Sequence, residues 1–161
     1  MLEEATPRKA LEFAVTTEKI GAQIYQKLAK RFEDNEELKE LFTSLAKDEQ
    51  AHEREFKALL DRLPVDDNPV QYEQEQYLRA MAISDVFSDE EGIGKSVDAI
   101  STREDALERA LSLEKSTLMY YTALSDVIGT SEAVDAIIAA EKRHVIRVMQ
   151  LMITGERPKP L

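Results

Sequence analysis

Apolar residues recur every three or four positions along four long segments of the chain. In the second segment, for example, the run is Leu38, Leu41, Phe42 and Leu45. This spacing places apolar side chains on one face of an α-helix, so it predicts four amphipathic helices. We expect them at about residues 6–33, 35–63, 102–128 and 131–153. Glycine and proline are scarce, at five each, which also favours an all-α class.

Short polar signals mark where the helices begin. Thr6 followed by Pro7 is typical of an N-cap residue and a first helical position. Asp34 and Glu37 have the spacing of a capping box, so we expect Asp34 to cap the second helix. Pro64 ends that helix, because proline lacks the backbone N–H that a helix interior requires.

The connections between the helices predict the topology. The first two helices are separated by only a few residues, as are the last two, so each pair should form an antiparallel hairpin. Residues 64–101 make a long connection, in which we expect a short helix at about 69–87 and a loop at 88–100. Two helical hairpins joined by one long crossover form the ferritin-like antiparallel four-helix bundle. A length of 161 residues suits a single domain of this kind.

The composition excludes several kinds of partner and site. Lysine and arginine number 21 against 32 aspartates and glutamates, a net charge of −11, which argues against nucleic acid or an anionic membrane as a partner. No apolar run approaches the length of a membrane span, and no basic segment followed by an apolar one opens the chain. We therefore expect a cytoplasmic protein. The absence of cysteine excludes disulfides, iron–sulfur clusters and thiolate zinc sites.

Charged residues interrupt the apolar faces near the middle of all four predicted helices. The first and third helices each carry one such glutamate, and the second and fourth each carry a Glu-x-x-His pair. These candidate ligands are Glu18, Glu49, His52, Glu114, Glu141 and His144. Four ionised carboxylates in a bundle core are very costly unless cations neutralise them. Two divalent ions would balance four carboxylates and two neutral imidazoles, so the pattern predicts a two-metal site.

The spacing within the two Glu-x-x-His pairs supports this prediction. Residues three apart share a helix face, so the carboxylate and the imidazole of one pair can reach the same metal. The chain has only two histidines, and both belong to such a pair. The same ligand pattern occurs in ferritin-like di-iron and di-manganese bundles. Carboxylate and imidazole ligands favour two iron ions, with manganese or a mixed pair as alternatives. The competing interpretation is a set of solvated or salt-bridged surface glutamates.

Three further residues lie near the predicted ligands. Asp48 could accept a hydrogen bond from a ligand imidazole, or it could be a surface residue in a charged run. Tyr25 and Tyr121 each lie seven residues after a central glutamate, because the two helical hairpins repeat the same pattern. Their hydroxyls could bind ligand carboxylates or act as redox relays. The alternative is two core tyrosines whose hydroxyls are paired elsewhere.

The sequence around these residues resembles the rubrerythrin-related, stand-alone di-iron carboxylate proteins of the ferritin-like superfamily. The likeness is carried by residues 17–25, 48–52, 113–121 and 141–144. It implies that Glu49 and Glu141 bridge two metals and that each histidine binds one of them. Glu18 and Glu114 would be terminal ligands. The resemblance also implies a non-haem di-iron oxidoreductase, of the peroxidase or oxidase type, and a homodimer.

The chain departs from the family pattern in two ways. Rubrerythrins usually carry a rubredoxin module with four cysteines, whereas the 161 residues of this chain include no cysteine. Electrons would therefore come from a separate donor. Rubrerythrins also have another glutamate one turn after the ligand of the third helix, where this chain has Thr117. Because only a few residues follow Ile153 here, we expect no fifth helix of the kind that cage-forming ferritins have. Iron oxidation and hand-over, or a structural metal site without turnover, are the alternative functions.

Overall fold

The computed structural model of the chain is built from α-helices. It describes residues 5–64, 69–82, 97–129 and 131–154. The helices are α1 (Pro7–Arg31), α2 (Glu36–Arg62), α3 (Tyr72–Ala82), α5 (Arg103–Ile128) and α6 (Glu132–Thr154). No strand occurs in these ranges, in agreement with the predicted all-α class. None of the helices described here is long and apolar enough to cross a membrane.

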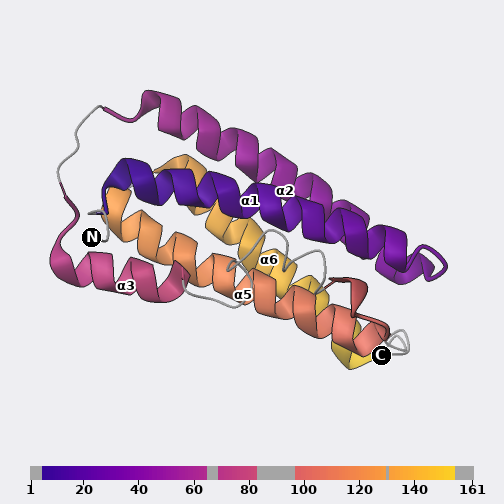
Figure 1. Ribbon diagram of the computed structural model, residues 1–161. Coiled ribbons are helices and arrows are strands. Elements are labelled where there is room, and N and C mark those ends of the chain that lie inside the picture. The colour runs from indigo at the N-terminus through magenta and orange to yellow at the C-terminus, as the bar shows by residue number, and fades with distance from the viewer. Residues whose placement is uncertain (1–4, 65–68, 83–96, 130, 155–161) are drawn as a thin grey trace, which may run out of the picture.

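Two helical hairpins pack side by side to form a four-helix bundle (Figure 1). α1 and α2 run antiparallel along each other, as do α5 and α6. Across the bundle, α1 lies against α5 and α2 lies against α6, while α3 packs along α5. The end of α2 and the start of α5 lie at opposite ends of the bundle, so the connection between the hairpins crosses its length. The predicted bundle of two hairpins with one crossover is confirmed.

The crossover agrees with the prediction only in part. We expected a helix at about residues 69–87, and α3 begins slightly later than that. Residues 83–87 lie outside the part of the chain that the structure describes. Most of the loop expected at 88–100 lies outside it as well. At the end of that segment, Val97 and Ile100 are buried in the core.

The helix starts follow the capping rules, with one change of residue. Thr6 caps α1, because its side chain accepts a hydrogen bond from the backbone N–H of Lys9 at 3.2 Å. The expectation that Asp34 caps α2 is wrong. Asn35 is the cap and accepts a hydrogen bond from the N–H of Leu38 at 3.1 Å. The turn after α1 includes Asp34, so the extended backbone that an N-cap needs falls one residue later.

Two apolar clusters fill the bundle, one toward each end. The first lies where α1 ends and α2 begins, and it includes Phe42 and Leu45. The second lies toward the start of α1 and the end of α2, and it includes Phe56 and Leu124. Between them, inward-facing positions carry buried glutamates and histidines instead of apolar side chains. Apolar packing on both sides of this polar layer strengthens the electrostatic interactions within it.

Candidate metal centre

All six predicted ligand side chains converge in the polar layer between the two apolar clusters. None of the six is more than 6 % exposed. They are Glu18 of α1, Glu49 and His52 of α2, Glu114 of α5, and Glu141 and His144 of α6. The competing interpretation, that these glutamates lie on a solvated surface, is therefore wrong.

Helical periodicity explains why these charged residues point inward. On α1, Leu11, Glu18 and Tyr25 are seven residues apart and all three are buried. Seven residues make almost two helical turns, so the glutamate shares the face of the apolar residues around it. α5 repeats this arrangement around Glu114. On α2 and α6, a spacing of three residues puts the glutamate and the histidine on one face.

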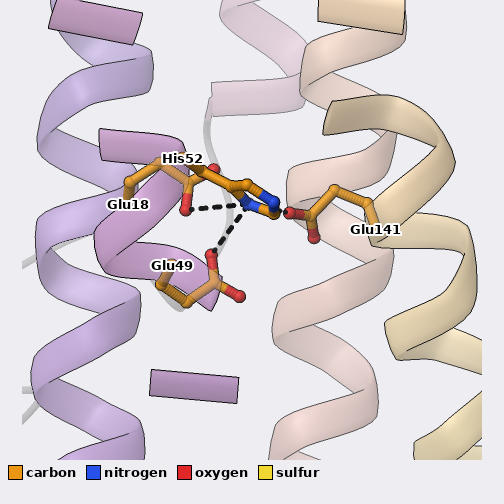
Figure 2. A group of neighbouring side chains, drawn as sticks. All are labelled: Glu18, Glu49, His52 and Glu141. Carbon is orange, nitrogen blue, oxygen red and sulfur yellow. Dashed lines mark ion pairs between the residues drawn. The ribbon is translucent and has the colours of Figure 1, made fainter. Parts of the chain in front are cut away.

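The first ligand set surrounds the imidazole of His52 (Figure 2). Its Nδ1 atom lies 2.9 Å from Glu141 Oε1, 3.6 Å from Glu18 Oε2 and 3.8 Å from Glu49 Oε2. Carboxylates from three different helices thus face one ring nitrogen. One donor atom from each of the four residues lies within 4.8 Å of all the others. A single metal ion can be bound at this spacing.

The second ligand set surrounds the imidazole of His144. Its Nδ1 atom lies 3.2 Å from Glu114 Oε2, 3.5 Å from Glu49 Oε1 and 3.7 Å from Glu141 Oε2. Glu49 and Glu141 belong to both sets, and each directs one oxygen toward each histidine. The two imidazole rings have centroids 5.7 Å apart. This arrangement could hold two neighbouring metal ions that share two carboxylates.

Several polar atoms of the cluster lack the hydrogen-bond partners that buried polar atoms need, and metal ions could bind them instead. Five buried atoms of the six candidate ligands have no hydrogen-bond partner among the described residues: Glu18 Oε1 and Oε2, Glu49 Oε1, His52 Nδ1 and Glu141 Oε1. The short distance between His52 and Glu141 is therefore not aligned as a hydrogen bond. Buried polar atoms without partners are strongly destabilising. Two divalent cations would satisfy these atoms and cancel the charge, so the donor set fits a di-metal site.

The electrostatics of the cluster favour protons on several of its groups. Burial, and then repulsion from neighbouring carboxylates, raises the pKa of Glu18 and Glu114 well above the usual range. Burial alone would lower the pKa of His52, but nearby carboxylates raise it to about 12, and they raise the pKa of His144 as well. Burial alone would raise the pKa of Glu141, but the histidines hold it below its usual range. Metal ions bind deprotonated ligands, so they would compete with these protons.

The two tyrosines near the ligands differ from each other. The Tyr25 hydroxyl donates a hydrogen bond to Glu114 Oε1, so Tyr25 contacts a ligand carboxylate, one of its two predicted roles. The Tyr121 hydroxyl is buried without a hydrogen-bond partner in the described ranges. Burial, and then the charge of the neighbouring Glu18 carboxylate, raises the pKa of Tyr121, although the two groups are not aligned as a hydrogen bond.

Asp48 contacts the site from its outer side. Its Oδ2 atom lies 3.1 Å from His144 Nε2, whereas Nδ1 of the same ring faces the other ligands. The Asp48 side chain is also 46 % exposed and lies 3.9 Å from Arg147 Nη1, so it is a surface residue as well as a neighbour of the site. A neutral imidazole that binds metal through Nδ1 carries its proton on Nε2. Asp48 would accept a hydrogen bond from that proton.

Two further contacts were not predicted from the sequence. Thr117 Oγ1 lies 3.1 Å from Glu141 Oε2 and 3.0 Å from a backbone carbonyl of α5. Gly21 lies beside Glu49, where a Cβ atom on the glycine would be 3.6 Å from Cγ of the glutamate. Both residues follow a central glutamate by three positions and so share its inward face. That spacing is the signal that could have identified them.

Comparisons with known proteins agree with this geometry. The family model described as Rubrerythrin matches residues 9–98, more than half of the chain. A solved structure from Thermotoga maritima, described as a ferritin-like diiron-carboxylate protein, has a similar fold. It shares 26 % sequence identity at a TM-score of 0.76, and the match covers 96 % of this chain and 99 % of the other. No match was found among curated proteins.

The family model matches one half of the site, and the similar structure covers both halves. The family match includes α1 and α2, and thus Glu18, Glu49 and His52. The similar structure extends the likeness to α5 and α6, which supply the other three side chains. The family match, the similar structure and the buried carboxylate–histidine cluster together indicate a ferritin-like di-iron carboxylate protein. The chain belongs to the rubrerythrin family.

Proposed function

We propose that this protein holds two iron ions in the cluster and acts as an oxidoreductase that reduces hydrogen peroxide or dioxygen. The observation that carries the proposal is the sharing of Glu49 and Glu141 between two complete ligand sets. Shared carboxylates would keep two metal ions close enough to act on one small substrate. The description of the Thermotoga maritima protein as a diiron-carboxylate protein supports iron here as well.

The ligand chemistry also supports iron. Each proposed position offers three carboxylates and one imidazole, a mixture that suits iron and manganese. Zinc is usually four-coordinate and prefers sites richer in sulfur or nitrogen. Manganese, or a mixed pair of metals, would use the same six residues.

The protein's own groups would bind the metals and keep them in place during the reaction. Two ferrous ions that become ferric supply the two electrons that convert one hydrogen peroxide and two protons into two waters. Glu49 and Glu141 would hold both ions together, while the Tyr25 hydroxyl orients Glu114 at one of them. The 161 residues contain no cysteine and hence no ligand set for an iron–sulfur carrier. A separate electron donor would return the ions to the ferrous state.

Anaerobic reaction of the ferrous protein with peroxide tests the proposal. The chain is loaded with ferrous iron, mixed with hydrogen peroxide and followed by the absorbance of the ferric product. We expect much faster oxidation than in the Glu141→Ala variant, which loses a shared ligand. Glu108→Ala, at an exposed position of α5, is the matched control and should react like the wild type. Equal rates for the wild type and Glu141→Ala would overturn the proposal.

The same measurements distinguish the alternative functions. A protein for iron oxidation and hand-over would oxidise ferrous ions repeatedly, well beyond two per chain. A structural metal site would gain thermal stability on metal binding, but neither peroxide nor dioxygen would change the oxidation state of the metal. Either result would replace redox turnover as the function and leave the proposed ligands in place.

A further inference from the structure

The two metal positions are related by an internal repeat. Glu18 corresponds to Glu114, 96 residues later, and the Glu-x-x-His pair of α2 corresponds to that of α6, 92 residues later. We call the position formed by Glu114 and His144 the capped half, and the position formed by Glu18 and His52 the open half. The bridging glutamates belong to both. The same two offsets match each residue near one half with a residue near the other half. The contacts of the two halves can therefore be compared one by one.

The first difference lies at the outer nitrogen of each histidine. In the capped half, Asp48 Oδ2 lies 3.1 Å from His144 Nε2. The counterpart of Asp48 is Ala140, which has no carboxylate to offer His52. A carboxylate at this place fixes the ring and makes the imidazole a stronger ligand, and its loss typically weakens metal binding by about 10- to 100-fold. Only the capped half has this support among the described residues.

The second difference lies at the bridging carboxylates. Thr117 Oγ1 lies 3.1 Å from Glu141 Oε2, the oxygen directed toward the capped half. The counterpart of Thr117 is Gly21, where a Cβ atom would lie 3.8 Å from Glu49 Oε2, the oxygen directed toward the open half. A hydroxyl can therefore orient the bridging oxygen of the capped half, and no side chain occupies the equivalent place in the open half.

The third difference lies at the terminal glutamates. Tyr25 donates a hydrogen bond to Glu114 in the capped half. Tyr121 is the counterpart of Tyr25, and its buried hydroxyl has no hydrogen-bond partner in the described parts of the chain. Both carboxylate oxygens of Glu18 likewise lack a hydrogen-bond partner among the described residues. The three supporting contacts are thus present in the capped half. In the open half, Gly21 and Ala140 cannot make two of them, and the Tyr121 hydroxyl lies near Glu18 without hydrogen-bond geometry.

A cavity of about 350 Å³ lies between α2 and α6 and reaches the outer side of both histidines. Ala51 and Ala140, whose side chains are small, line it together with His52. His144 also lines the cavity, but its outer nitrogen is paired with Asp48. The cavity therefore offers a small ion a short route to the open half.

We propose that the capped half is the tightly held metal position and that the open half is an exchangeable position, which fills second, empties first and communicates with solvent through this cavity. Preorganised ligands bind more tightly because less ordering is needed on binding. The inference rests on the proposed function only in requiring that the cluster binds two metal ions. It adds that these ions are held unequally, and it identifies Ala140 as the residue that keeps the open half exchangeable.

A Zn²⁺ titration of the whole chain tests the order of filling. Zn²⁺ is diamagnetic, so calorimetry and histidine NMR can follow the same titration, and the chain's two histidines give two sets of imidazole signals. We expect two binding steps that differ by about 10- to 100-fold in affinity. The first step should shift the signals of His144, and the second those of His52. Asp48→Asn assigns the His144 signals, because Asp48 contacts that ring.

Ala140→Asp supplies the missing carboxylate and tests the cause of the difference. We expect it to tighten the second step by about tenfold, so that the two affinities approach each other. Ala140→Asn offers an uncharged acceptor and should give a smaller effect of the same sign, which keeps the test valid if the aspartate disturbs folding. Ala139→Asp is the matched control, since it adds the same charge at an exposed neighbouring position, and it should leave both steps unchanged.

The outcomes separate this inference from the function on which it rests. Two equal steps in the wild type, or filling of the His52 position first, would overturn the inference and leave the two-metal proposal intact. The same holds if Ala140→Asp and Ala140→Asn both bind Zn²⁺ as Ala139→Asp does. Failure of the wild type to bind two ions would instead overturn the proposed function.

Discussion

The hairpins α1–α2 and α5–α6 contribute the same inner residues to the centre, a glutamate from the first helix and a Glu-x-x-His pair from the second. Their surroundings differ. A tyrosine, a threonine and an aspartate contact the ligands that belong to α5 and α6. The corresponding places around the ligands of α1 and α2 are taken by an unpaired tyrosine, a glycine and an alanine. The repeat of the inner residues thus indicates which groups can bind metal. The difference between the residues that contact them bears on the affinity with which each hairpin would bind it.

Removing a bridging carboxylate should have the largest effect, because it damages both positions at once. In Glu49→Ala or Glu141→Ala protein we expect the metal content to fall from two ions per chain to one or none. The affinity should be weaker by on the order of 100-fold or more, since even the loss of a contact outside the ligands costs about 10- to 100-fold. Metal analysis of the dialysed variants measures both quantities.

The two terminal glutamates allow a sharper form of this experiment. Glu18→Ala removes a ligand of the open half, so the ion that remains should be the tightly held one. Glu114→Ala removes a ligand of the capped half, and its remaining ion should be lost more readily during dialysis. If both variants retain the same amount of metal, the two hairpins are equivalent in binding and the comparison fails.

Metal removal should have the next largest effect. A ligand present at 100 times its Kd adds about 2.7 kcal/mol to the free energy of unfolding. For a chain of this length that corresponds to roughly 5–10 °C in Tm. Titration with a chelator, followed by thermal unfolding, measures the change. Unequal sites should give two steps in the loss of stability, and one single step would indicate equal sites.

The stabilisation by metal should also depend on pH. The pKa of His52 is raised from 6.5 to about 12, so its protonated form stabilises the metal-free fold fully below pH 6.5, and that contribution is lost as the pH rises toward 12. The pKa values of Glu18 and Glu114 are also raised. Their protonated forms therefore stabilise the metal-free fold at low pH as well, and this contribution is lost as the pH rises through their raised pKa values. Metal binding, in contrast, strengthens as the ligands lose protons. We expect the Tm difference between loaded and metal-free protein to widen from about pH 6 to about pH 9, and a constant difference would contradict this.

The ligands could be predicted from the sequence because a charged residue inside an apolar stripe is visible in one helix at a time. The contacts around them could not. Tyr25 and Glu114 are 89 residues apart, and their hydrogen bond depends on how α1 packs against α5. Gly21 and Thr117 are small residues on a packed helix face, where small side chains are also typical of close helix packing. Periodicity alone does not tell these two roles apart.

The fold shows the same division between local and non-local information. The hairpins followed from helical periodicity and from short connections, which are local properties of the chain. The crossover helix was harder to delimit, because Leu78 is its one buried residue in the described range and gives a weak apolar stripe. The cap of α2 fell at Asn35 and not at Asp34, because the length of the preceding turn decides between two suitable neighbours.

Replacing each of the two tyrosines by phenylalanine should reveal a smaller difference between the hairpins, in the free energy of unfolding. Tyr25→Phe removes a hydrogen bond to a buried carboxylate, so the free energy of unfolding of the metal-free protein should fall by about 1–3 kcal/mol. Tyr121→Phe removes a buried hydroxyl with no partner among the described residues, so it should be neutral or slightly stabilising. Urea unfolding gives both values. Similar losses in the two variants would show that Tyr121 is hydrogen-bonded to Glu18 in solution.

The smallest difference is expected at Thr117 and Gly21, where replacements should change the free energy of unfolding in opposite directions. Thr117→Val keeps the shape of the side chain but removes the hydroxyl beside Glu141, so we expect a loss of about 1 kcal/mol. Gly21→Ala should add about 0.5–1 kcal/mol, because alanine favours a helix interior and restricts the unfolded chain.

Nothing in the local geometry opposes the alanine. Its Cβ atom would lie 3.6 Å from Glu49 Cγ, an ordinary contact, and Gly21 does not have a positive φ. Urea unfolding of the metal-free variants measures both changes. If Gly21→Ala is destabilising instead, the carboxylate of Glu49 must use the space beside the glycine. The weaker binding proposed for the open half would then arise from movement of a bridging ligand and not from a missing contact.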